Sequence, residues 1–355
     1  MGASDTTGKI NNTTSEARNN LDRAFSLIIC TAQRPLSLQK LLKSIEKQSI
    51  LPPQILIIDG SENEATEKIL FNFSLEGLEY YKVDKKNKGL TRQRNFGVGK
   101  LKKETKIVFF LDDDTILSTF YFEEVLKTYR SYPDAVGVGG YITNEVEWKK
   151  VSEEYVVKKG EFQYDSWVRR EGSRFVLRRK CGLAPDVPPG MMPDFSHGYS
   201  IGFLPPSGKV YEIEMMMGGI ASYKKELFDK ISFSSYFEGY GLYEDADFSL
   251  RASKIGKLYV NTAAKVEHHH APEGRPDMVK YGKMVVTNGW YVWRIKNPNP
   301  SIKASWKWIF TNCLLMGIRV KNEVIDGEKG ALKDAMGRLS ALMNLIFQRP
   351  EKPKT

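Results

Sequence analysis

One segment constrains the fold of this chain more than any other: the apolar run 107–111 passes directly into three aspartates, Asp112, Asp113 and Asp114. A run that is apolar and then abruptly acidic is typical of a buried parallel strand that emerges at its carboxyl edge. Ligands of open α/β sheets bind outside that edge. Three adjacent carboxylates repel one another, and a divalent cation would relieve the repulsion. The alternative is a solvated turn in which an aspartate caps a helix over 116–129.

Strand-like and helix-like patterns alternate around this segment. Apolar runs predict strands, and apolar residues at helical spacing predict helices between them. The alternation predicts an α/β fold with a mostly parallel central sheet flanked by helices. A later apolar run, 258–266, is expected as a strand at the sheet edge. The first strands are expected over 25–30, 54–58, 78–83, 106–111 and 135–142, and the first helices over 36–48, 62–71 and 92–99.

Changes in composition divide the 355 residues into five parts. Residues 1–22 are polar and predict a disordered tail. The alternating segment 23–144 forms the first half of the sheet. Residues 145–215, with many charges and Pro and Gly clusters, predict an insertion of loops and short strands that shapes a substrate site. Strand and helix patterns return over 216–275, and 276–355 predicts a C-terminal helical region.

Charge and cysteine content narrow the class of protein. The net charge of +10 suits nucleic acid, anionic lipid or a phosphate-bearing substrate. The basic residues are spread along the chain without a nucleic-acid-binding motif, so we expect no nucleic acid partner. Three scattered cysteines indicate a reducing compartment. We expect a cytoplasmic protein, since no apolar run reaches 18 residues and no signal peptide is visible. Met1-Gly2 with Thr6 also fits a myristoylation pattern.

Polar residues follow the first two strands. After strand one, Thr31, Arg34 and the start of a helix favour an anion or a nucleotide, or form a plain capped turn. After strand two, Asp59 either accepts hydrogen bonds from a base or ribose or caps the next helix. The segment 87–97 carries three cations that suit a diphosphate, although basic helix faces are often only solvated.

Two further clusters lie downstream. Glu244 and Asp245 stand at a helix start, where the helix dipole favours carboxylates and where one of them would serve as a general base. His268, His269 and His270 are three of only four histidines. Imidazole suits a transition metal such as Mn²⁺ better than Mg²⁺. The alternative is a solvated histidine cluster.

The ordered set of motifs resembles the inverting family 2 glycosyltransferases with the Rossmann-like GT-A fold. The similarity covers about residues 24–295. The motifs that carry it are Thr31 after the first strand, Asp59-Gly60-Ser61, Asn87-x-Gly89 with Arg94-Asn95-x-Gly97, Asp112 to Asp114, Gly218-Gly219, Glu244-Asp245-Ala246-Asp247 with Arg251, and His268.

The resemblance implies a role for each candidate residue. Asp245 would be the catalytic base and Glu244 would contact the acceptor. Asp114 and His268 would hold Mn²⁺ or Mg²⁺, with Asp112 and His270 as weaker candidates. The residues implied to bind the nucleotide sugar are Thr31, Arg34, Asp59, Arg94, Asp113 and Gly219.

The resemblance also implies an activity: metal-dependent, inverting transfer of a hexose-type sugar from a nucleoside diphosphate sugar to a hydroxyl of a glycan or lipid-linked acceptor. Such chemistry serves cell-surface polysaccharide or glycoconjugate synthesis. A sugar nucleotidyltransferase and a catalytically inactive carbohydrate-binding relative are the alternatives. Trp306 and Lys307 beside apolar residues suit peripheral contact of the C-terminal helices with the inner face of the plasma membrane. Ordinary helix packing is the alternative.

Overall fold

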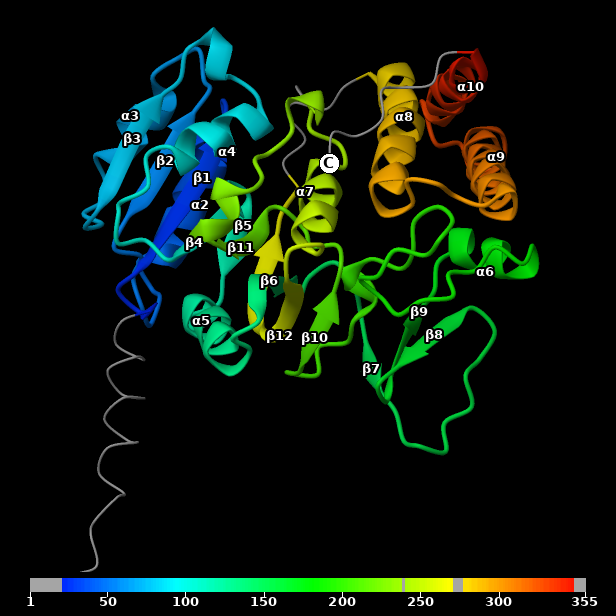
Figure 1. Cartoon of the computed structure of the whole chain (residues 1–355), viewed down its shortest axis with the longest axis horizontal. Helices are drawn as coiled ribbons and strands as arrows, with labels where there is room; N and C mark the ends of the chain where they lie inside the picture. The colour runs from blue at the N-terminus through cyan, green and yellow to red at the C-terminus, as the bar shows by residue number, and fades with distance from the viewer. Residues whose placement is uncertain (1–20, 238–239, 271–276, 348–355) are drawn as a thin grey trace, which may run out of the picture.

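The computed structural model of the protein describes residues 21–237, 240–270 and 277–347 (Figure 1). Its centre is a nine-stranded sheet in the order β10-β12-β6-β11-β4-β1-β2-β3, with β5 paired to β12. The predicted tail and the myristoylation pattern lie outside the described residues, except for positions 21 and 22. The strands are β1 (Phe25–Thr31), β2 (Ile55–Asp59), β3 (Leu78–Lys82), β4 (Ile107–Asp112), β5 (Thr115–Leu117), β6 (Ala135–Ile142), β10 (Val210–Ile213), β11 (Ile220–Lys224) and β12 (Lys257–His268).

The first half of the sheet is parallel, as the strand–helix alternation predicts. β3, β2, β1 and β4 pair side by side in one direction. The register places Thr31 of β1 opposite Asp59 of β2, and Cys30 opposite Asp112 of β4. The polar residues that end three strands therefore meet at one edge of the sheet.

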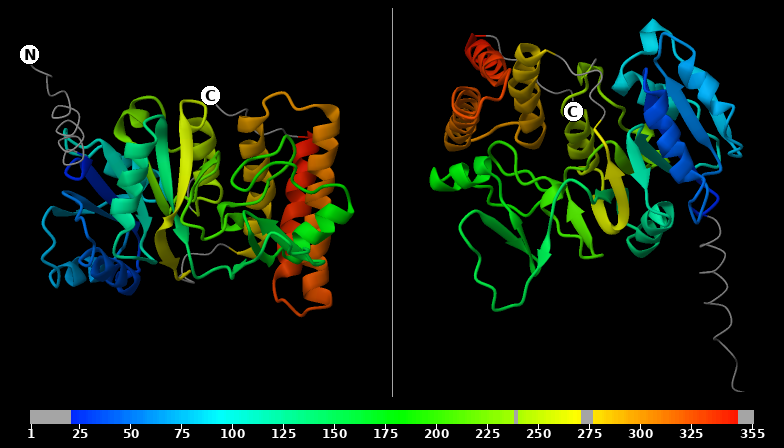
Figure 2. Two further views of the ribbon diagram at one scale, coloured as in Figure 1. Left: turned by 90° about the horizontal axis from the view of Figure 1, so that it is seen from below. Right: turned by 180° about the vertical axis from the view of Figure 1, so that it is seen from behind.

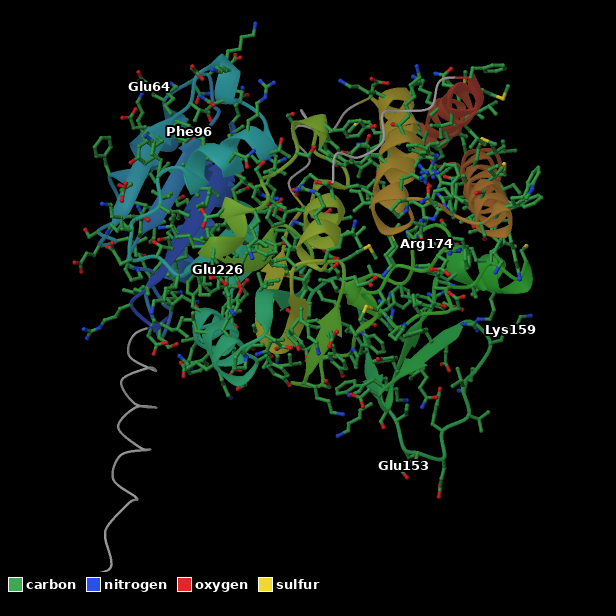
Figure 3. The ribbon with its side chains drawn as sticks, viewed as in Figure 1. Glu64, Phe96, Glu153, Lys159, Arg174 and Glu226 are labelled. Atoms are coloured by element: carbon green, nitrogen blue, oxygen red, sulfur yellow. The ribbon has the colours of Figure 1, made fainter. Side chains whose placement is uncertain are left out.

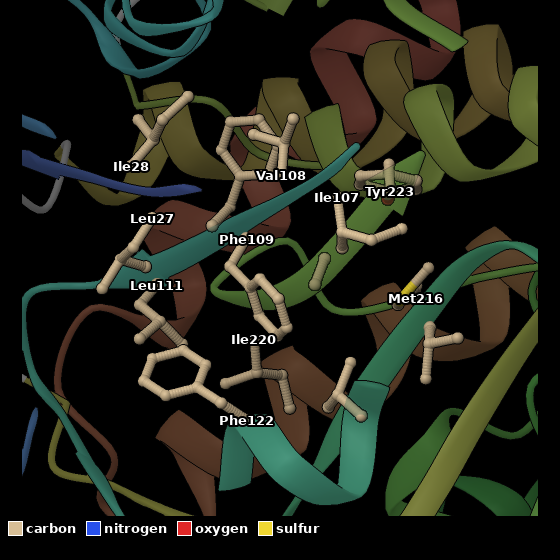
Figure 4. Close-up of a cluster of buried hydrophobic side chains, with 14 of the residues drawn as sticks. Leu27, Ile28, Ile107, Val108, Phe109, Leu111, Phe122, Met216, Ile220 and Tyr223 are labelled. Carbon is tan, nitrogen blue, oxygen red and sulfur yellow. The ribbon is translucent and has the colours of Figure 1, made fainter. Parts of the chain in front are cut away.

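Aliphatic and aromatic side chains are buried around β1 and β4 (Figure 4). Phe122 of α5 packs against Phe25 and Phe109, with ring centroids 5.5 and 5.1 Å apart. Successive strand residues point to opposite faces, and Phe110 packs instead against Phe233, 5.2 Å away. Both faces are thus buried, which is why these strands read as continuous apolar runs. The helices of the sheet domain are α2 (Pro35–Ile45), α3 (Ala65–Leu70), α4 (Leu90–Val98), α5 (Tyr121–Ser131) and α7 (Glu244–Ala252), with 3₁₀ turns η1 (Lys85–Asn87), η2 (Ile201–Phe203), η3 (Lys225–Asp229) and η4 (Ser235–Phe237).

The second half of the sheet is mixed. β11 runs antiparallel to both β4 and β6, whereas β12 runs parallel to β6 and antiparallel to β10. The expected edge position of 258–266 is wrong, because β10 from the insertion pairs along the outer side of β12. The predicted α/β class, with a central sheet flanked by helices and a C-terminal helical extension, is confirmed.

The helix expected over 116–129 is wrong at its beginning. Residues 115–117 form β5, and α5 begins only at Tyr121. β5 pairs antiparallel with the end of β12, so that Thr115 lies opposite His268. Backbone pairing with a distant strand thus overrides the local helical pattern. The same pairing brings His268 beside the three aspartates.

The insertion over 145–215 contains more regular structure than loops alone. It forms a second sheet in the order β7-β9-β8, followed by one helix. The helix of the insertion lies next to the C-terminal helices in Figures 1 and 2, and the small sheet lies farther from them. Their bounds are β7 (Lys149–Lys150), β8 (Glu161–Tyr164), β9 (Trp167–Arg170) and α6 (Ser173–Lys180).

Three helices follow the sheet domain, as predicted, and gather on the side away from β3 (Figure 2). Asp334 of α10 is 1% exposed and accepts from Arg338, while Arg319 of α9 lies 2.7 Å from its second oxygen. Among the described helices, none combines the length and the hydropathy needed to cross a bilayer. The domain boundaries drawn from composition remain predictions. The helices are α8 (Met278–Lys296), α9 (Ile302–Val324) and α10 (Ala331–Phe347).

Candidate active site

A hollow of about 850 Å³ opens at the carboxyl edge of β1 and β4. Both ends of the sheet domain contribute to its wall, since residues 30–34 and 112–114 face residues 240–245 across it. Most of the predicted site residues are therefore brought together. Those in the wall are Thr31, Arg34, Asp112, Asp113, Asp114, Glu244, Asp245, His268 and His270.

Asp113 joins two of the predicted nucleotide-binding residues. The Thr31 hydroxyl donates to one Asp113 carboxylate oxygen at 2.6 Å, and Arg34 Nη1 lies 3.3 Å from the other. Burial raises the pKa of Asp113 to about 7, although the Thr31 hydrogen bond and the Arg34 charge oppose this. A ligand that donates hydrogen bonds to this carboxyl group would favour its ionised form.

Asp59 lies beneath the wall rather than in it. It is fully buried and accepts from the Ser61 amide at 2.8 Å and from the Tyr80 hydroxyl at 2.9 Å. The Ser61 hydroxyl in turn accepts from the Gln33 amide at 2.7 Å. Gln33 has a φ of +59°, which is uncommon for a residue with a side chain. Asp59 thus helps to hold the loop that carries Arg34.

Arg94 is buried between the two halves of the site. Its Nη1 donates to Glu244 Oε1 at 2.6 Å, and its Nη2 lies 3.4 Å from Asp112 Oδ1. Burial raises the pKa of Glu244 to about 8, and the Arg94 charge opposes that rise. The resemblance implied that Arg94 binds the nucleotide sugar, whereas its guanidinium contacts carboxylates from β4 and α7. Arg94 therefore joins α7 to the end of β4.

The paired glycines before β11 make room for these carboxylates. A Cβ on Gly219 would lie 2.1 Å from Asp112 Oδ2, and one on Gly218 would lie 2.8 Å from both Arg94 Nη1 and Glu244 Oε1. Neither contact is tolerable unless the cluster shifts. The close approach found here is therefore between the Gly218-Gly219 backbone and the ionic cluster.

Asp245 stands at the first turn of α7 and lines the hollow. Its two oxygens accept from the amides of Ala246, at 2.8 Å, and Gly218, at 3.4 Å. Burial raises its pKa above that of an ordinary aspartate. Tyr243, two residues earlier, has a φ of +69°. Strain in a non-glycine residue of this kind is common where a side chain is held for function.

Two overlapping groups of side chains have the donor atoms of a cation site. Asp112, Asp114 and His268 form one group, and Glu145, His268 and His270 form the other, each with ligand atoms within 4.8 Å of one another. His268 Nε2 lies 3.1 Å from Asp114 Oδ1, and its Nδ1 lies 3.1 Å from Glu145 Oε1. Carboxylate oxygens with imidazole fit Mn²⁺ better than Mg²⁺.

The pKa of His268 responds to these same neighbours. Burial lowers it, but the hydrogen bonds to Asp114 and Glu145 raise it to about 10. His269 instead reaches Glu267 at 3.2 Å and belongs to neither group. Of the three adjacent histidines, His268 and His270 are therefore the ones that meet carboxylates of the site.

Glu145 is the site residue that sequence reasoning missed. It belongs to the turn after β6, and its Oε1 lies 2.8 Å from His270 Nε2. Its neighbour Asn144 exchanges two hydrogen bonds of 2.9 Å with the His268 backbone. No motif surrounds this turn, so only the pairing of β6 with β12 could have revealed it. A carboxylate that accepts from the second ring nitrogen of a metal-binding histidine is a common supporting contact.

The fold and the edge cluster together define an α/β protein whose carboxylates and histidines gather at the carboxyl edge of the sheet. A model of the family Glycosyl transferase family 2 matches residues 26–193. The resemblance based on the motifs is thereby confirmed. The matched segment contains the Asp112–Asp114 cluster and ends before Glu244.

Solved structures with similar folds have low sequence identity to this chain. The crystal structure of S. aureus TarS is 14% identical, with a TM-score of 0.48 over 92% of this chain and 49% of that one. A structure of S. aureus TarS 1-349 in complex with UDP is 13% identical, with a TM-score of 0.44 over 86% of this chain and 74% of that one. GalNAc-T7 with UDP, GalNAc and Mn2+ is 15% identical, with a TM-score of 0.46 over 78% and 51%. The chain spans about half the length of the first of these structures, and no curated protein matches it.

Proposed function

We propose that this protein is a metal-dependent, inverting glycosyltransferase that moves a sugar from a nucleoside diphosphate sugar to a hydroxyl group. The observation that carries the proposal is the position of Asp245. It lines the same hollow as Asp113, Asp114 and His268, although it comes from the opposite half of the chain. A base and an anion-binding edge that share one hollow suit the displacement of a diphosphate by a hydroxyl.

The nucleotide-binding edge would hold the donor. Thr31, Arg34 and Asp113 form a hydrogen-bonded group at the end of β1, where a ribose and a phosphate would lie. Asp114 and His268 would hold Mn²⁺ or Mg²⁺, with Asp112 and Glu145 beside them. A bound cation would neutralise the negative charge that grows on the departing diphosphate.

Asp245 would accept the proton of the acceptor hydroxyl. As that proton leaves, the hydroxyl oxygen forms a bond to the anomeric carbon, and the bond from this carbon to the diphosphate oxygen breaks. One in-line displacement inverts the configuration at the anomeric carbon. Burial raises the pKa of Asp245, which makes it a better base than an exposed aspartate. Glu244, held by Arg94, would fix the position of the loop before α7 and contact the acceptor.

Two other functions fit less well. A sugar nucleotidyltransferase usually carries a glycine-rich phosphate loop after its first strand, and residues 31–35 contain no glycine. An inactive carbohydrate-binding relative would be expected to lose carboxylates at the base or cation positions. Asp112, Asp114 and Asp245 are all present and face one hollow.

The C-terminal helices offer a surface for peripheral contact with an anionic membrane. Ile302, Trp306 and Phe310 follow one another at intervals of four along α9 and are 79%, 56% and 58% exposed. α10 presents a second exposed apolar stripe that includes Met336 and Phe347. Apolar stripes beside lysines on a chain of net charge +10 suit an anionic leaflet. At that membrane surface, the protein would encounter a glycan or lipid-linked acceptor of cell-surface polymer synthesis.

A flotation experiment tests this contact. Wild-type protein should float with vesicles that contain anionic lipid, and a Trp306→Ser, Phe310→Ser variant should remain at the bottom of the gradient. A Lys68→Ser variant on the exposed surface of α3 is the control. Wild-type protein that stays below anionic vesicles would contradict the membrane proposal and leave the transferase proposal intact.

A turnover screen tests the transferase itself. Nucleoside diphosphate sugars are incubated with the protein and Mn²⁺ or Mg²⁺, and the release of nucleoside diphosphate is measured. We expect one nucleotide sugar to be consumed only when the metal is present. The proposal fails if none binds or turns over with either metal.

A further inference from the structure

A second hollow also reaches Asp245, and it encloses about 330 Å³. Asp245, Tyr243 and Glu145 line this hollow as well as lying at the candidate active site. Most of the rest of its wall comes from the insertion and from α8 and α9, two regions that the sequence motifs left without a function. We call it the helix-side hollow.

The wall of the helix-side hollow is mainly apolar. Methionines are prominent in it, and their flexible, polarisable side chains adapt to irregular ligands. Its size and lining are those of a small-molecule site, in which apolar walls surround a few polar groups. The apolar side chains that line it include Met192, Met215, Met216, Met217, Val292, Trp308 and Leu315.

One cation in this wall has no carboxylate beside it. Arg174 of α6 lies where α6 approaches the C-terminal helices (Figure 3), and its guanidinium is 4.8 Å from the centre of the Phe175 ring. Within the described ranges, no aspartate or glutamate comes within ion-pair distance of it. The two carboxylates of the wall are engaged elsewhere, Glu145 with histidines and Asp245 with backbone amides.

A second arginine adds positive charge behind the wall. Arg178 is fully buried and donates to the carbonyls of Leu183, at 2.9 Å, and His197, at 3.0 Å. His197 lines the hollow, and its pKa is lowered to about 3 by burial and then by Arg178 and Arg174. The cationic side of an otherwise apolar cavity thus favours an anion.

We propose that the helix-side hollow binds the acceptor, and that the acceptor is an anionic amphiphile. Its apolar part would pack on the methionines and Trp308, its anionic group would meet Arg174, and its hydroxyl would reach Asp245. The inference rests on the proposed glycosyl transfer, since the proposed base, Asp245, lines both hollows. It gives the insertion and the C-terminal helices one task, which is to select the acceptor.

Gly289 of α8 provides a way to fill the hollow without disturbing the rest of the molecule. A Cβ at this position meets only Tyr243 Cε2, at 3.7 Å. The side chain of Gly289→Leu would therefore extend into the helix-side hollow. Gly317→Leu on α9 is the matched control, because a Cβ there meets nothing within 4 Å and the residue does not line the hollow. At both positions, leucine has a higher helix propensity than the glycine it replaces.

Isothermal titration with three probes tests the proposal. Octyl phosphate carries the apolar and the anionic part, octyl glucoside carries only the apolar part, and inorganic phosphate carries only the anion. Wild-type protein should bind octyl phosphate at least about tenfold more tightly than either of the others. Gly289→Leu should no longer bind octyl phosphate, whereas Gly317→Leu should bind it like the wild type. Arg174→Gln should no longer bind octyl phosphate more tightly than octyl glucoside.

The same samples are titrated with nucleoside diphosphate and Mn²⁺. All variants should bind the nucleotide like the wild type, and octyl phosphate should not displace it. Unchanged octyl phosphate binding in Gly289→Leu, a retained preference in Arg174→Gln, or displacement of the nucleotide would each overturn the inference. Failure of the transferase proposal has a different signature, since the wild type would then bind no nucleoside diphosphate.

Discussion

The two hollows that meet at Asp245 differ in how they are built. The one at the sheet edge carries polar and charged side chains at or just beyond the ends of β1, β4 and β12, and several of them hydrogen-bond to one another. The helix-side hollow is lined mainly by apolar side chains from the insertion and the C-terminal helices. A charged diphosphate suits the first, and an amphiphile suits the second. Asp245 is placed to take a proton where the two ligands would meet.

The largest effect should come from Asp245, the proposed base, which lines both hollows. Asp245→Asn keeps the shape and the hydrogen bonds to Ala246 and Gly218 partly intact but removes the base. We expect transfer to fall by about 10³-fold while nucleoside diphosphate binding changes less than about twofold. Steady-state turnover measures the transfer rate, and calorimetric titration measures nucleoside diphosphate binding. The exposed Asp186→Asn is the control, and transfer by Asp245→Asn at the wild-type rate would show that the base lies elsewhere.

The ion pair that joins the two halves of the site should affect stability most. Arg94→Met leaves the buried Glu244 without its cation, which should lower the free energy of unfolding by about 3–5 kcal/mol. The exposed pair Lys68–Glu64 gives the comparison, because Lys68→Met should cost less than about 1 kcal/mol. Urea unfolding, monitored by circular dichroism, gives the free energy of unfolding of both variants. A loss in Arg94→Met no greater than in Lys68→Met would mean that the pair does not hold the halves together.

Removal of a predicted cation ligand should act on the sheet-edge hollow alone. Asp114→Ala should weaken nucleoside diphosphate binding in Mn²⁺ by at least about a hundredfold, since the cation would contribute several kcal/mol at the diphosphate. Octyl phosphate binding in the helix-side hollow should be unchanged. Chelation of the metal from wild-type protein should reproduce the loss. Nucleotide binding that is insensitive to both treatments would contradict a metal-dependent donor site.

Glu145 should have a smaller effect on the same ion. Because its carboxylate accepts from His268 Nδ1, Glu145→Gln should weaken Mn²⁺ binding by about 10–100-fold without abolishing it. Manganese paramagnetic resonance measures the free ion directly. Glu147→Gln, two residues away and exposed, is the control. Equal affinities in the two variants would remove Glu145 from the site.

The pH profile should show the most gradual change. Asp245 must be ionised to accept a proton, so kcat/KM should fall about tenfold per pH unit below its pKa. Burial raises that pKa, and the fall should therefore begin above the ordinary aspartate value of about 4. Activity that persists undiminished to that value would argue against a buried base. The Asp245→Asn variant should lack this limb of the profile.

The sheet-edge hollow was largely predictable from the sequence, and the helix-side hollow was not. Thr31 and Asp112 each follow an apolar run, so parallel strand order alone brings them to one edge. His268 could be matched to the cation site by motif order, but its contact with Glu145 depends on the pairing of β12 with β5 and β6. No local pattern encodes that pairing.

Arg94 shows a second limit of sequence reasoning. Its place in a basic helix start suggested a phosphate or a base as its partner. The partner found is Glu244, 150 positions further along the chain, together with Asp112. Likewise, Arg174 and Trp308 carry no motif, and only the approach of α6 to α9 places them around one cavity. Contacts between distant segments thus determine the parts of the site that the motifs leave out.

The stereochemistry of transfer is the most direct test of a single displacement with Asp245 as the base. That mechanism permits only inversion at the anomeric carbon. Proton NMR of the sugar at early times, with the nucleotide sugar that the turnover screen identifies, reports its anomeric configuration. We expect the new anomeric bond to have the configuration opposite to that of the donor. Retention of the donor configuration would contradict it.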